Sequence, residues 1–248
     1  MSASRPMKHT SYLAALARDG EEFAESCAAA GLSSPVASCP GWSVADLAWH
    51  LTEVHYFWRS IVSERRDTPQ GVERLLRPSD TDLLPGYRSG LVETLAVLTG
   101  VDWAQPNWTW SSDHTAGFVV RRMAQETAVH HWDADLAAAR STPIDAKLAS
   151  DGIDEFLTHM IGDVIADAAP IQGSVHLHCT DVPGEWTLRP TDDGGHSVTR
   201  EHSKGDAAMR GTASDLLLVL WRRLQLERIE VVGDAQVAKQ FVAQTSLD

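Results

Sequence analysis

The sequence predicts an all-helical domain followed by a smaller α+β domain. Over residues 1–169, apolar side chains recur three and four apart, which is the spacing of a helix face. From residue 170 onward the pattern becomes alternating, as in "GSVHLHCTDVPGEWTLRP", which is typical of strands. The length of 248 residues is enough for two ordinary domains. We therefore predict a helical domain over 1–169 and an α+β domain over 170–248.

Helix starts and stops divide the first domain into five predicted helices. Gly31 ends the first of them, and Ser43 followed by Asp46 forms a capping-box pattern, with Asp in the place of Glu, at the start of the second. The polar stretch 66–85 carries prolines and is interpreted as an exposed connection. The predicted helices cover 9–30, 43–66, about 87–98, a segment that contains 121–135 and ends before Pro143, and about 146–168.

The second domain is predicted from shorter signals. "DDGGHSVTRE" has the glycine turn and the alternation of a hairpin, "ASDLLLVLWRRLQLE" is an amphipathic helix, and "RIEVVGD" is a short strand before a last helix. His176 and His178 fall two apart on one predicted strand and could chelate a metal, but we interpret them as a half-exposed strand face. "GEW" and "EHSKGD" are interpreted as structural.

Composition excludes several classes of partner. The formal net charge is −13 and the isoelectric point is about 5.2, which argues against a nucleic-acid surface and an anionic membrane surface. No apolar run approaches the ~18 residues of a membrane span, and the N-terminus lacks the apolar core of a signal peptide. Cys27, Cys39 and Cys179 are far apart without a CxxC motif, a pattern of reducing compartments. We expect a cytoplasmic protein.

One helical stripe carries two polar side chains on an otherwise apolar face. In "RRMAQETAVHHWDAD" (121–135), Glu126 and His130 stand four apart beside Met123. A buried carboxylate must be paired or bound to a metal. Three interpretations are therefore open: a Glu126–His130 pair, an ion pair between Glu126 and Arg122, or two ligands of a metal ion.

The predicted second helix offers a third ligand. His50 lies on its buried stripe, and His55, five residues later, lies further round the helix. A histidine on an apolar face is usually a core residue, but helical bundles build metal sites from side chains on facing helices. His50, Glu126 and His130 would form a two-histidine, one-glutamate set that leaves a coordination position open, as in catalytic zinc sites. The same set also suits non-haem iron.

Two segments carry a resemblance to a known family. "CPGWSVADLAWHLTEVHYFW" (39–58), followed by "RRMAQETAVHHWDADLA" (121–137), resembles the mycothiol-dependent maleylpyruvate isomerase family of actinobacteria. The resemblance implies a DinB-like four-helix metal-binding bundle followed by an α+β C-terminal domain. It also implies zinc ligands at His50, Glu126 and His130.

The resemblance extends to the C-terminal region. "ASDLLLVLWRRLQLERIEVVGD" is similar to a segment in which the family has an arginine that faces the active site, and Arg223 falls in its place. The family's preceding glycine is Arg222 here. Arg223 would bind a substrate carboxylate or stabilise an enolate; its alternative role is a surface charge on the last turn of a helix. Asp133 could orient a ligand or bind polar groups of the thiol cofactor, and its alternative is solvated helix surface.

The expected chemistry starts from a thiol supplied from outside. A metal-bound thiol is deprotonated, and Cys39, which could approach the site, is interpreted as a small buried residue. The resemblance implies mycothiol, a low-molecular-weight thiol, as cosubstrate with a small electrophile. A thioether adduct that persists gives S-transfer, whereas one that rotates and expels the thiol gives cis–trans isomerisation. We favour S-transfer because the Trp-rich loop 103–110 and Arg222 depart from the family.

Two further classes of function remain as alternatives. A zinc hydrolase or iron oxygenase could use the same three ligands, although the chain has no HExxH motif. A non-catalytic metal-binding module would use the metal only to hold the bundle together.

Overall fold

The computed structural model describes residues 7–161, 172–192 and 195–245. Its internal contacts divide the chain into two compact units. One unit is Lys8–Thr142, and the other is Pro143–Asp248 together with Met1–Met7. The predicted boundary after residue 169 lies outside the described residues. Each unit is considered by itself below.

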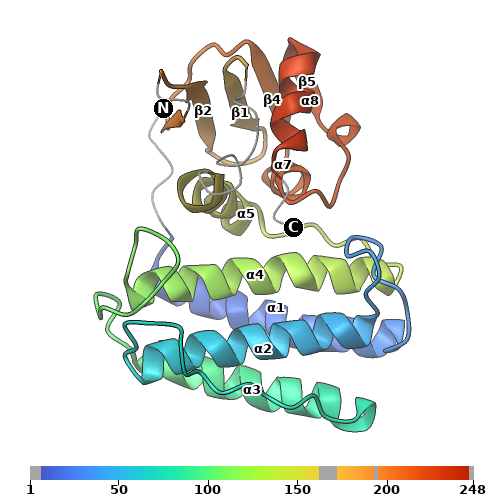
Figure 1. The fold of residues 1–248 in the computed structure, drawn as a ribbon. Helices are drawn as coiled ribbons and strands as arrows, with labels where there is room; N and C mark the ends of the chain where they lie inside the picture. The colour runs from blue at the N-terminus through green and yellow to red at the C-terminus, as the bar shows by residue number, and fades with distance from the viewer. Residues whose placement is uncertain (1–6, 162–171, 193–194, 246–248) are drawn as a thin grey trace. The chain divides into compact units, whose positions relative to one another are not determined.

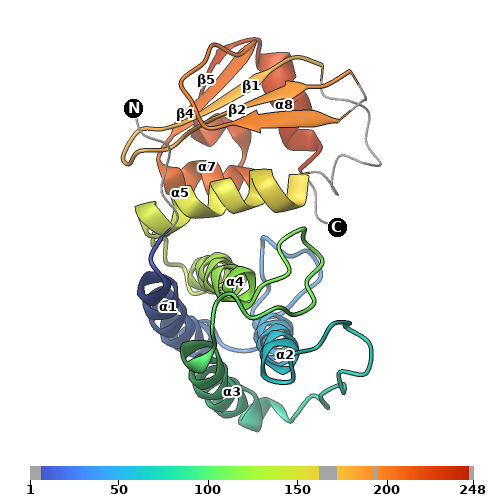
Figure 2. The same ribbon diagram turned by 90° about the vertical axis from the view of Figure 1, so that its left-hand side faces the viewer.

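The first unit is a bundle of four helices, which confirms the four-helix bundle that the resemblance implies (Figure 1). The fifth helix that the sequence predicts begins at Ala146, in the second unit. Viewed end-on in Figure 2, the four helices lie around a shared interior. This interior is apolar and includes Phe23, Leu47, Leu51 and Tyr87, which are buried. The helices are α1 (His9–Ala30), α2 (Val44–Ser63), α3 (Asp80–Gly100) and α4 (Ala116–Ala137).

Local signals set both ends of α1 and the start of α2 as predicted; α2 ends at Ser63, three residues before the predicted end. α1 has the predicted bounds, and Gly31 follows it with φ of 84°, a left-handed conformation that favours glycine. The Ser43 side chain accepts a hydrogen bond from the Asp46 N–H, and the Asp46 side chain accepts one from the Ser43 N–H. This reciprocal pair is the predicted capping box, so aspartate serves in the place of glutamate.

α3 begins earlier than the sequence predicts, because a proline near the start of a helix does not prevent the helix from forming. The helix starts at Asp80, inside the stretch interpreted as a connection, and contains Pro85. Acidic residues in the first turn, Asp80 and Asp82, favour a helix N-terminus. Pro85 removes one intrahelical donor on an exposed side of the helix, where water can satisfy the freed carbonyl.

The second unit is a five-stranded mixed sheet with helices packed against it (Figure 2). The strand order is β3-β2-β1-β4-β5, with β1 and β4 parallel and the other neighbours antiparallel. α7 and α8 pack against β1 and β4, and α5 packs against α7. The elements are α5 (Ala146–Glu155), a π-helical turn (Phe156–Met160), β1 (Val175–Cys179), β2 (Glu185–Pro190), β3 (His196–Thr199), β4 (Ala207–Gly211), α7 (Ala213–Leu220), a 3-10 turn (Leu226–Arg228), β5 (Glu230–Gly233) and α8 (Ala235–Ala243).

Two elements of this unit differ from the sequence prediction. β4 was not predicted, because its five residues carry no run of β-branched or aromatic side chains. α7 ends at Leu220, seven residues before the end of the predicted helix. The cause is Arg222, whose φ of 59° is left-handed and closes the helix C-terminus. Here the Arg223 N–H donates to the Leu218 carbonyl at 2.8 Å.

Within the described residues, none of the helices combines the length and the apolar composition that crossing a bilayer would require.

Candidate metal centre

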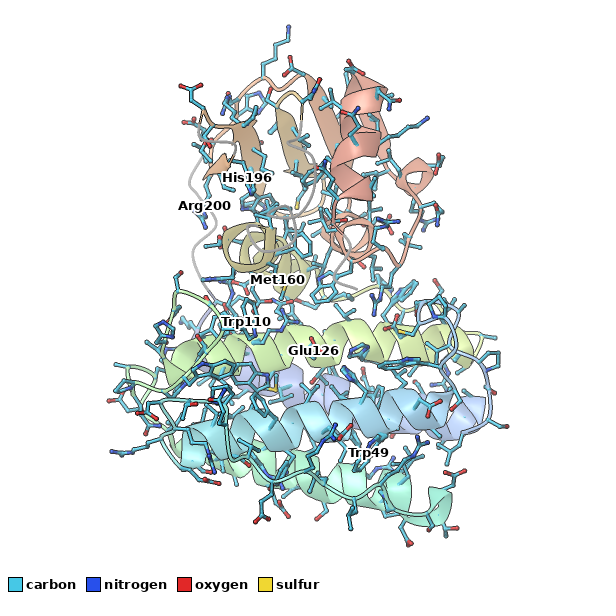
Figure 3. The ribbon with its side chains drawn as sticks, in the orientation of Figure 1. Trp49, Trp110, Glu126, Met160, His196 and Arg200 are labelled. Atoms are coloured by element: carbon cyan, nitrogen blue, oxygen red, sulfur yellow. The ribbon has the colours of Figure 1, made fainter. Side chains whose placement is uncertain are left out.

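The three predicted metal ligands come together in the first unit. His50 lies on α2, and Glu126 and His130 lie on α4, with Glu126 near the middle of that helix (Figure 3). Glu126 Oε1 is 3.4 Å from His50 Nε2 and 3.2 Å from His130 Nε2. One ligand atom from each residue lies within 4.8 Å of the other two. The spacing of Glu126 and His130 is local, and the packing of α2 on α4 adds His50.

This geometry fits a tetrahedral metal ion. Ligand atoms that surround one zinc at ~2.0–2.1 Å lie ~3.3–3.4 Å from one another. The two measured separations, 3.2 Å and 3.4 Å, agree with that spacing. The side chain of His50 is 34% exposed and that of Glu126 is 17% exposed, so the set is reachable from solvent. Three protein ligands with an open side are the layout of a catalytic zinc site.

Glu126 divides its two oxygens between different partners. Oε1 faces the two histidines, whereas Oε2 accepts a hydrogen bond from Arg122 Nη2 at 3.0 Å. Burial raises the pKa of Glu126, but the hydrogen bonds to His130 and His50 and the charge of Arg122 hold it well below its usual range. The carboxylate is therefore ionised, as a metal ligand must be. The Glu–His and Glu–Arg pairs that the sequence left as alternatives are both present.

Asp133 orients the His130 ring by binding Nδ1, the nitrogen that faces away from the metal position. His130 Nδ1 donates to Asp133 Oδ2 at 2.9 Å, and the other carboxylate oxygen, Oδ1, accepts from Ser38 Oγ at 2.6 Å. Asp133 is only 1% exposed, so the interpretation as solvated surface is wrong. Burial lowers the pKa of His130, but the hydrogen bonds to Asp133 and Glu126 outweigh it and raise the pKa to about 9. A carboxylate on the far nitrogen is the usual way to orient a histidine toward a metal.

The surroundings distinguish the two histidines of α2. His50 packs against Trp42, with ring centroids 5.1 Å apart. His55 is instead a core residue, 1% exposed, whose Nε2 lies 2.8 Å from Thr127 Oγ1. Burial lowers the pKa of His55 to about 3, which keeps its ring neutral. Cys39 lies at the edge of this region, with its thiol 3.9 Å from Asp133 Oδ2.

His131, next to His130 in the sequence, is buried on a different side of α4. It is 9% exposed, and its Nδ1 lies 3.6 Å from Asp19 Oδ1 on α1. Its Nε2 lies 3.7 Å from Asp135 Oδ1, one turn further along α4. α4 packs closely against α1, and this packing turns a second polar face of α4 inward.

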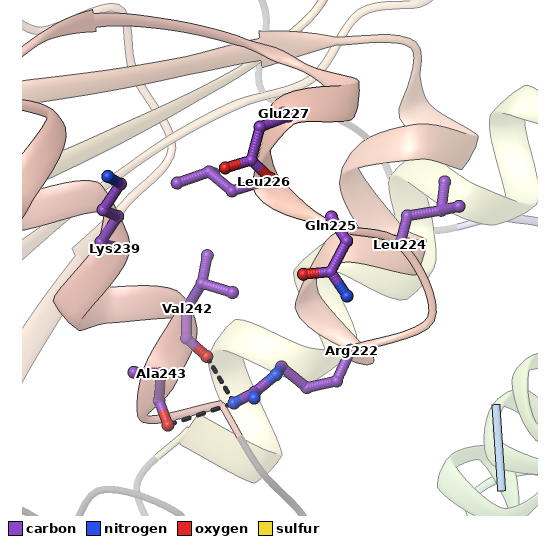
Figure 4. Close-up of a pocket in the computed structure, with 8 residues that line it drawn as sticks. All are labelled: Arg222, Leu224, Gln225, Leu226, Glu227, Lys239, Val242 and Ala243. Atoms are coloured by element: carbon purple, nitrogen blue, oxygen red, sulfur yellow. Dashed lines mark hydrogen bonds between the residues drawn. The ribbon is translucent and has the colours of Figure 1, made fainter.

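Arg223 and Arg222 belong to the second unit and have different surroundings. The Arg223 guanidinium donates to the Trp221 carbonyl at 3.0 Å and lies 5.8 Å from the centroid of the Trp221 ring. Arg222 donates to the carbonyls of Val242 and Ala243 at the end of α8 (Figure 4). Its φ of 59° lies in the left-handed region that glycine favours.

The sequence did not predict Ser38 as a support of Asp133, and it indicated only part of a second cluster. Ser38, which binds Asp133, comes from a loop 95 residues away and has no local signal. The second cluster is formed by His176, His178, Glu185 and His202. The signal for it was available, because histidines two apart share a strand face and a short hairpin brings Glu185 opposite His178.

Family models and solved structures match both units of the chain. The family model of the mycothiol maleylpyruvate isomerase N-terminal domain matches residues 13–135, and that of the C-terminal domain matches residues 147–240. Two crystal structures of the mycothiol-dependent maleylpyruvate isomerase, one of them of a histidine-to-alanine mutant, match with TM-scores of 0.60 and 0.62. Each covers 95% of this chain and 98% of its own, at 8% and 7% identity, which shows a shared fold. No curated protein sequence matches significantly.

Proposed function

The chain belongs to the mycothiol maleylpyruvate isomerase family, and on this premise we propose that it is a metal-dependent enzyme that uses mycothiol to isomerise a cis double bond in a small unsaturated acid. The convergence of His50, Glu126 and His130 in the domain that matches the family's N-terminal model carries the proposal. Isomerisation takes precedence over S-transfer, which the sequence favours, because the family models and both solved structures carry the name of an isomerase.

The metal set has a defined role for each residue. His50, Glu126 and His130 would hold a zinc ion, which when bound supplies an open coordination position and lowers the pKa of a thiol placed there. Asp133 fixes the proton of His130 on Nδ1, so that the Nε2 lone pair faces the metal position. Both oxygens of Asp133 are engaged by protein groups, so we assign it to positioning His130 and not to direct contact with mycothiol.

Isomerisation requires only that a thiolate adds and then leaves. The sulfur forms a bond to one alkene carbon while the π electrons move onto a conjugated carbonyl. The remaining single bond rotates, the electrons return, and the carbon–sulfur bond breaks. The thiol is regenerated and no atom is gained or lost, so no oxidant or reductant is needed.

Negative charge develops on the substrate's carbonyl oxygen in the addition step. A planar guanidinium binds a carboxylate or an oxyanion with two parallel hydrogen bonds. We assign this role to Arg223, because the sequence around it resembles the segment in which the family has an active-site arginine. The three cysteines are reduced, and Cys27 and Cys179 are buried, which supports an external nucleophile and a reducing, cytoplasmic location.

The direct test supplies the reaction with its proposed parts. Tag-free protein is stripped with a chelator, reloaded with zinc, and incubated with mycothiol and maleylpyruvate, while the cis and trans isomers are separated by chromatography. We expect the trans isomer only when both thiol and metal are present. Mass spectrometry of the same mixtures and of a panel of other electrophiles detects thioethers. A stable adduct without isomerisation would favour S-transfer, and no reaction at all would contradict both.

Metal removal separates catalysis from a purely structural role. We expect the stripped protein to keep its helical circular dichroism and to lose turnover. If the bundle unfolds as the metal leaves and zinc restores folding without activity, the non-catalytic metal-binding module is the better description.

A further inference from the structure

The outer face of the C-terminal sheet carries a second set of metal-type side chains. Along β1, His176 and His178 alternate with the buried residues Val175, Leu177 and Cys179, so both histidines point to the same face. β2 pairs with β1 so that Glu185 stands opposite His178. Three of the four side chains therefore share one sheet face as a consequence of strand period and register.

The fourth side chain arrives through the sheet topology. β3 is an edge strand, and the chain must cross β2 and β1 to reach β4. His202 lies in this crossing segment, and its Nδ1 is 2.8 Å from Glu185 Oε2. Its ring lies 5.3 Å from that of His176, edge to face. At the far end of the segment, Asp206 accepts hydrogen bonds from the N–H and hydroxyl of Ser174.

The donor atoms converge on one carboxylate. Glu185 Oε1 is 2.9 Å from His178 Nδ1, and Glu185 Oε2 is 3.6 Å from His176 Nε2. One ligand atom from each of the four residues lies within 4.8 Å of all the others. Neutral imidazoles present the lone pairs that transition metals bind.

One buried nitrogen of the cluster, His176 Nε2, lacks a hydrogen-bond partner among the described residues. The residue is only 6% exposed. Buried polar atoms in folded proteins almost always have a hydrogen-bonding or metal partner. This nitrogen points into the cluster, at 3.6 Å from Glu185 Oε2, where a bound cation would satisfy it.

We propose that His176, His178, Glu185 and His202 bind a second metal ion, separate from the site in the helical bundle. Three imidazole nitrogens and one carboxylate oxygen suit zinc and its divalent neighbours cobalt and nickel, whereas magnesium and calcium prefer oxygen ligands. Four protein ligands are the layout of a structural zinc site. The ion would tie the crossing segment 200–206 to the sheet through His202.

The site has a route by which an ion can enter. A pocket of about 470 Å³ lies over the same sheet face and is lined by His176, His178 and His202 together with residues of β4 and β5. The His202 side chain is 77% exposed, so it can move aside without disturbing the core. An accessible path of this kind is one requirement for metal loading.

The test counts zinc in the full-length, tag-free chain. Stripped protein is equilibrated with zinc, and bound metal is measured by inductively coupled plasma mass spectrometry. We expect the double variant His178→Ala/His202→Ala to bind one zinc ion per chain fewer than wild type. His196→Ala, which removes a β3 imidazole outside the cluster, should match wild type. Equal zinc content in the double variant and the control would overturn the proposal.

Two further measurements keep the test decisive. Because His202 is exposed, His202→Ala alone should fold normally and should weaken zinc binding if the double variant proves unstable. Hydrogen–deuterium exchange tests whether the metal links segment 200–206 to the sheet. Zinc should slow amide exchange over 200–206 in wild type and have no such effect in His202→Ala. Identical zinc-dependent protection in both would exclude His202 as a ligand. A Glu126→Gln variant should keep this protection, which separates this site from the bundle site.

Discussion

His130 Nδ1 and Asp133 Oδ2 lie 2.9 Å apart within one turn of α4, and both side chains are buried. This pair determines which ring nitrogen of His130 carries a proton. With the proton on Nδ1, the Nε2 lone pair faces Glu126 and His50, where a metal ion would be bound. The behaviour of the candidate metal centre therefore depends on a residue that need not touch the metal.

Replacing Asp133 by Asn should weaken metal binding without removing a ligand. The charge that raises the pKa of His130 is lost, so that pKa should fall from about 9 toward its ordinary value. Loss of such a supporting carboxylate typically costs ~10–100-fold in metal affinity, which is compared above pH 9 because the lower pKa also reduces competition from protons at neutral pH. Competition with a chromophoric chelator measures the affinity, and NMR titration of the metal-free protein measures the pKa. Asp135→Asn is the matched control, since Asp135 is also buried on α4 but binds Ser26. Equal losses in the two variants would contradict a specific role for Asp133.

His50→Ala and Glu126→Gln should each lose the metal of the bundle. Each variant leaves two of the three protein ligands, too few for a catalytic zinc site. Metal content is measured after purification without a histidine tag. His131→Ala provides the control, because it removes the neighbouring imidazole of α4, which lies near Asp19. Wild-type metal content at this site in both ligand variants would reject the assignment. A loss confined to His131→Ala would instead point to the acidic residues of α1.

Zinc affinity at the bundle site should rise with pH from acid conditions up to about 9. In the metal-free protein the raised pKa of His130 means that the ring is protonated below about 9, and zinc must displace that proton. The apparent affinity should therefore fall by about tenfold for each pH unit below that value. Isothermal titration calorimetry in buffers of different ionisation enthalpy also counts the protons released. An affinity that is flat from neutral pH upward would show that His130 is not a ligand.

His55 should make the fold sensitive to acid. Its pKa is lowered by burial to about 3, whereas in the unfolded chain it returns to about 6.5. The stabilisation is fully present above about 6.5 and is lost as pH falls, because the unfolded state then binds a proton that the folded state excludes. The expected slope is about 1.4 kcal/mol per pH unit. Urea unfolding at several pH values should show a smaller slope for His55→Gln, while His114→Gln, at an exposed loop histidine, should retain it.

Arg223→Lys should reduce turnover while the fold and the metal content are kept. Lysine keeps the charge but cannot form the paired hydrogen bonds of a guanidinium. If Arg223 stabilises the developing oxyanion, the rate constant should fall by ~10²-fold or more. Arg222→Gly is the control, because glycine accepts the φ of 59° and removes the guanidinium bound to the end of α8. Inactivity of Arg222→Gly with normal activity of Arg223→Lys would mean that the two arginines have been assigned in the wrong order. If neither changes turnover, the C-terminal domain does not bind the electrophile.

Much of the molecule follows from local rules in the sequence. The period of the helix places Glu126 and His130 on one stripe of α4, whatever packs against it. The capping box of Ser43 and Asp46 and the glycine after α1 set helix ends because their hydrogen bonds and backbone angles involve only neighbouring residues. The class of the fold was predicted in the same way, from apolar spacing of three and four in one part of the chain and of two in the other.

Tertiary structure decided what these rules leave open. Both His50 and His55 were on the inner side of the second helix, and only the packing of α2 on α4 sends one toward Glu126 and the other into the core. Asp133 could have been solvated surface, and Ser38 from a distant loop makes it a buried support. On the sheet, His202 reaches His176 because the chain crosses two strands between β3 and β4. Contacts between residues far apart in sequence depend on how whole elements pack, and no local pattern encodes that packing.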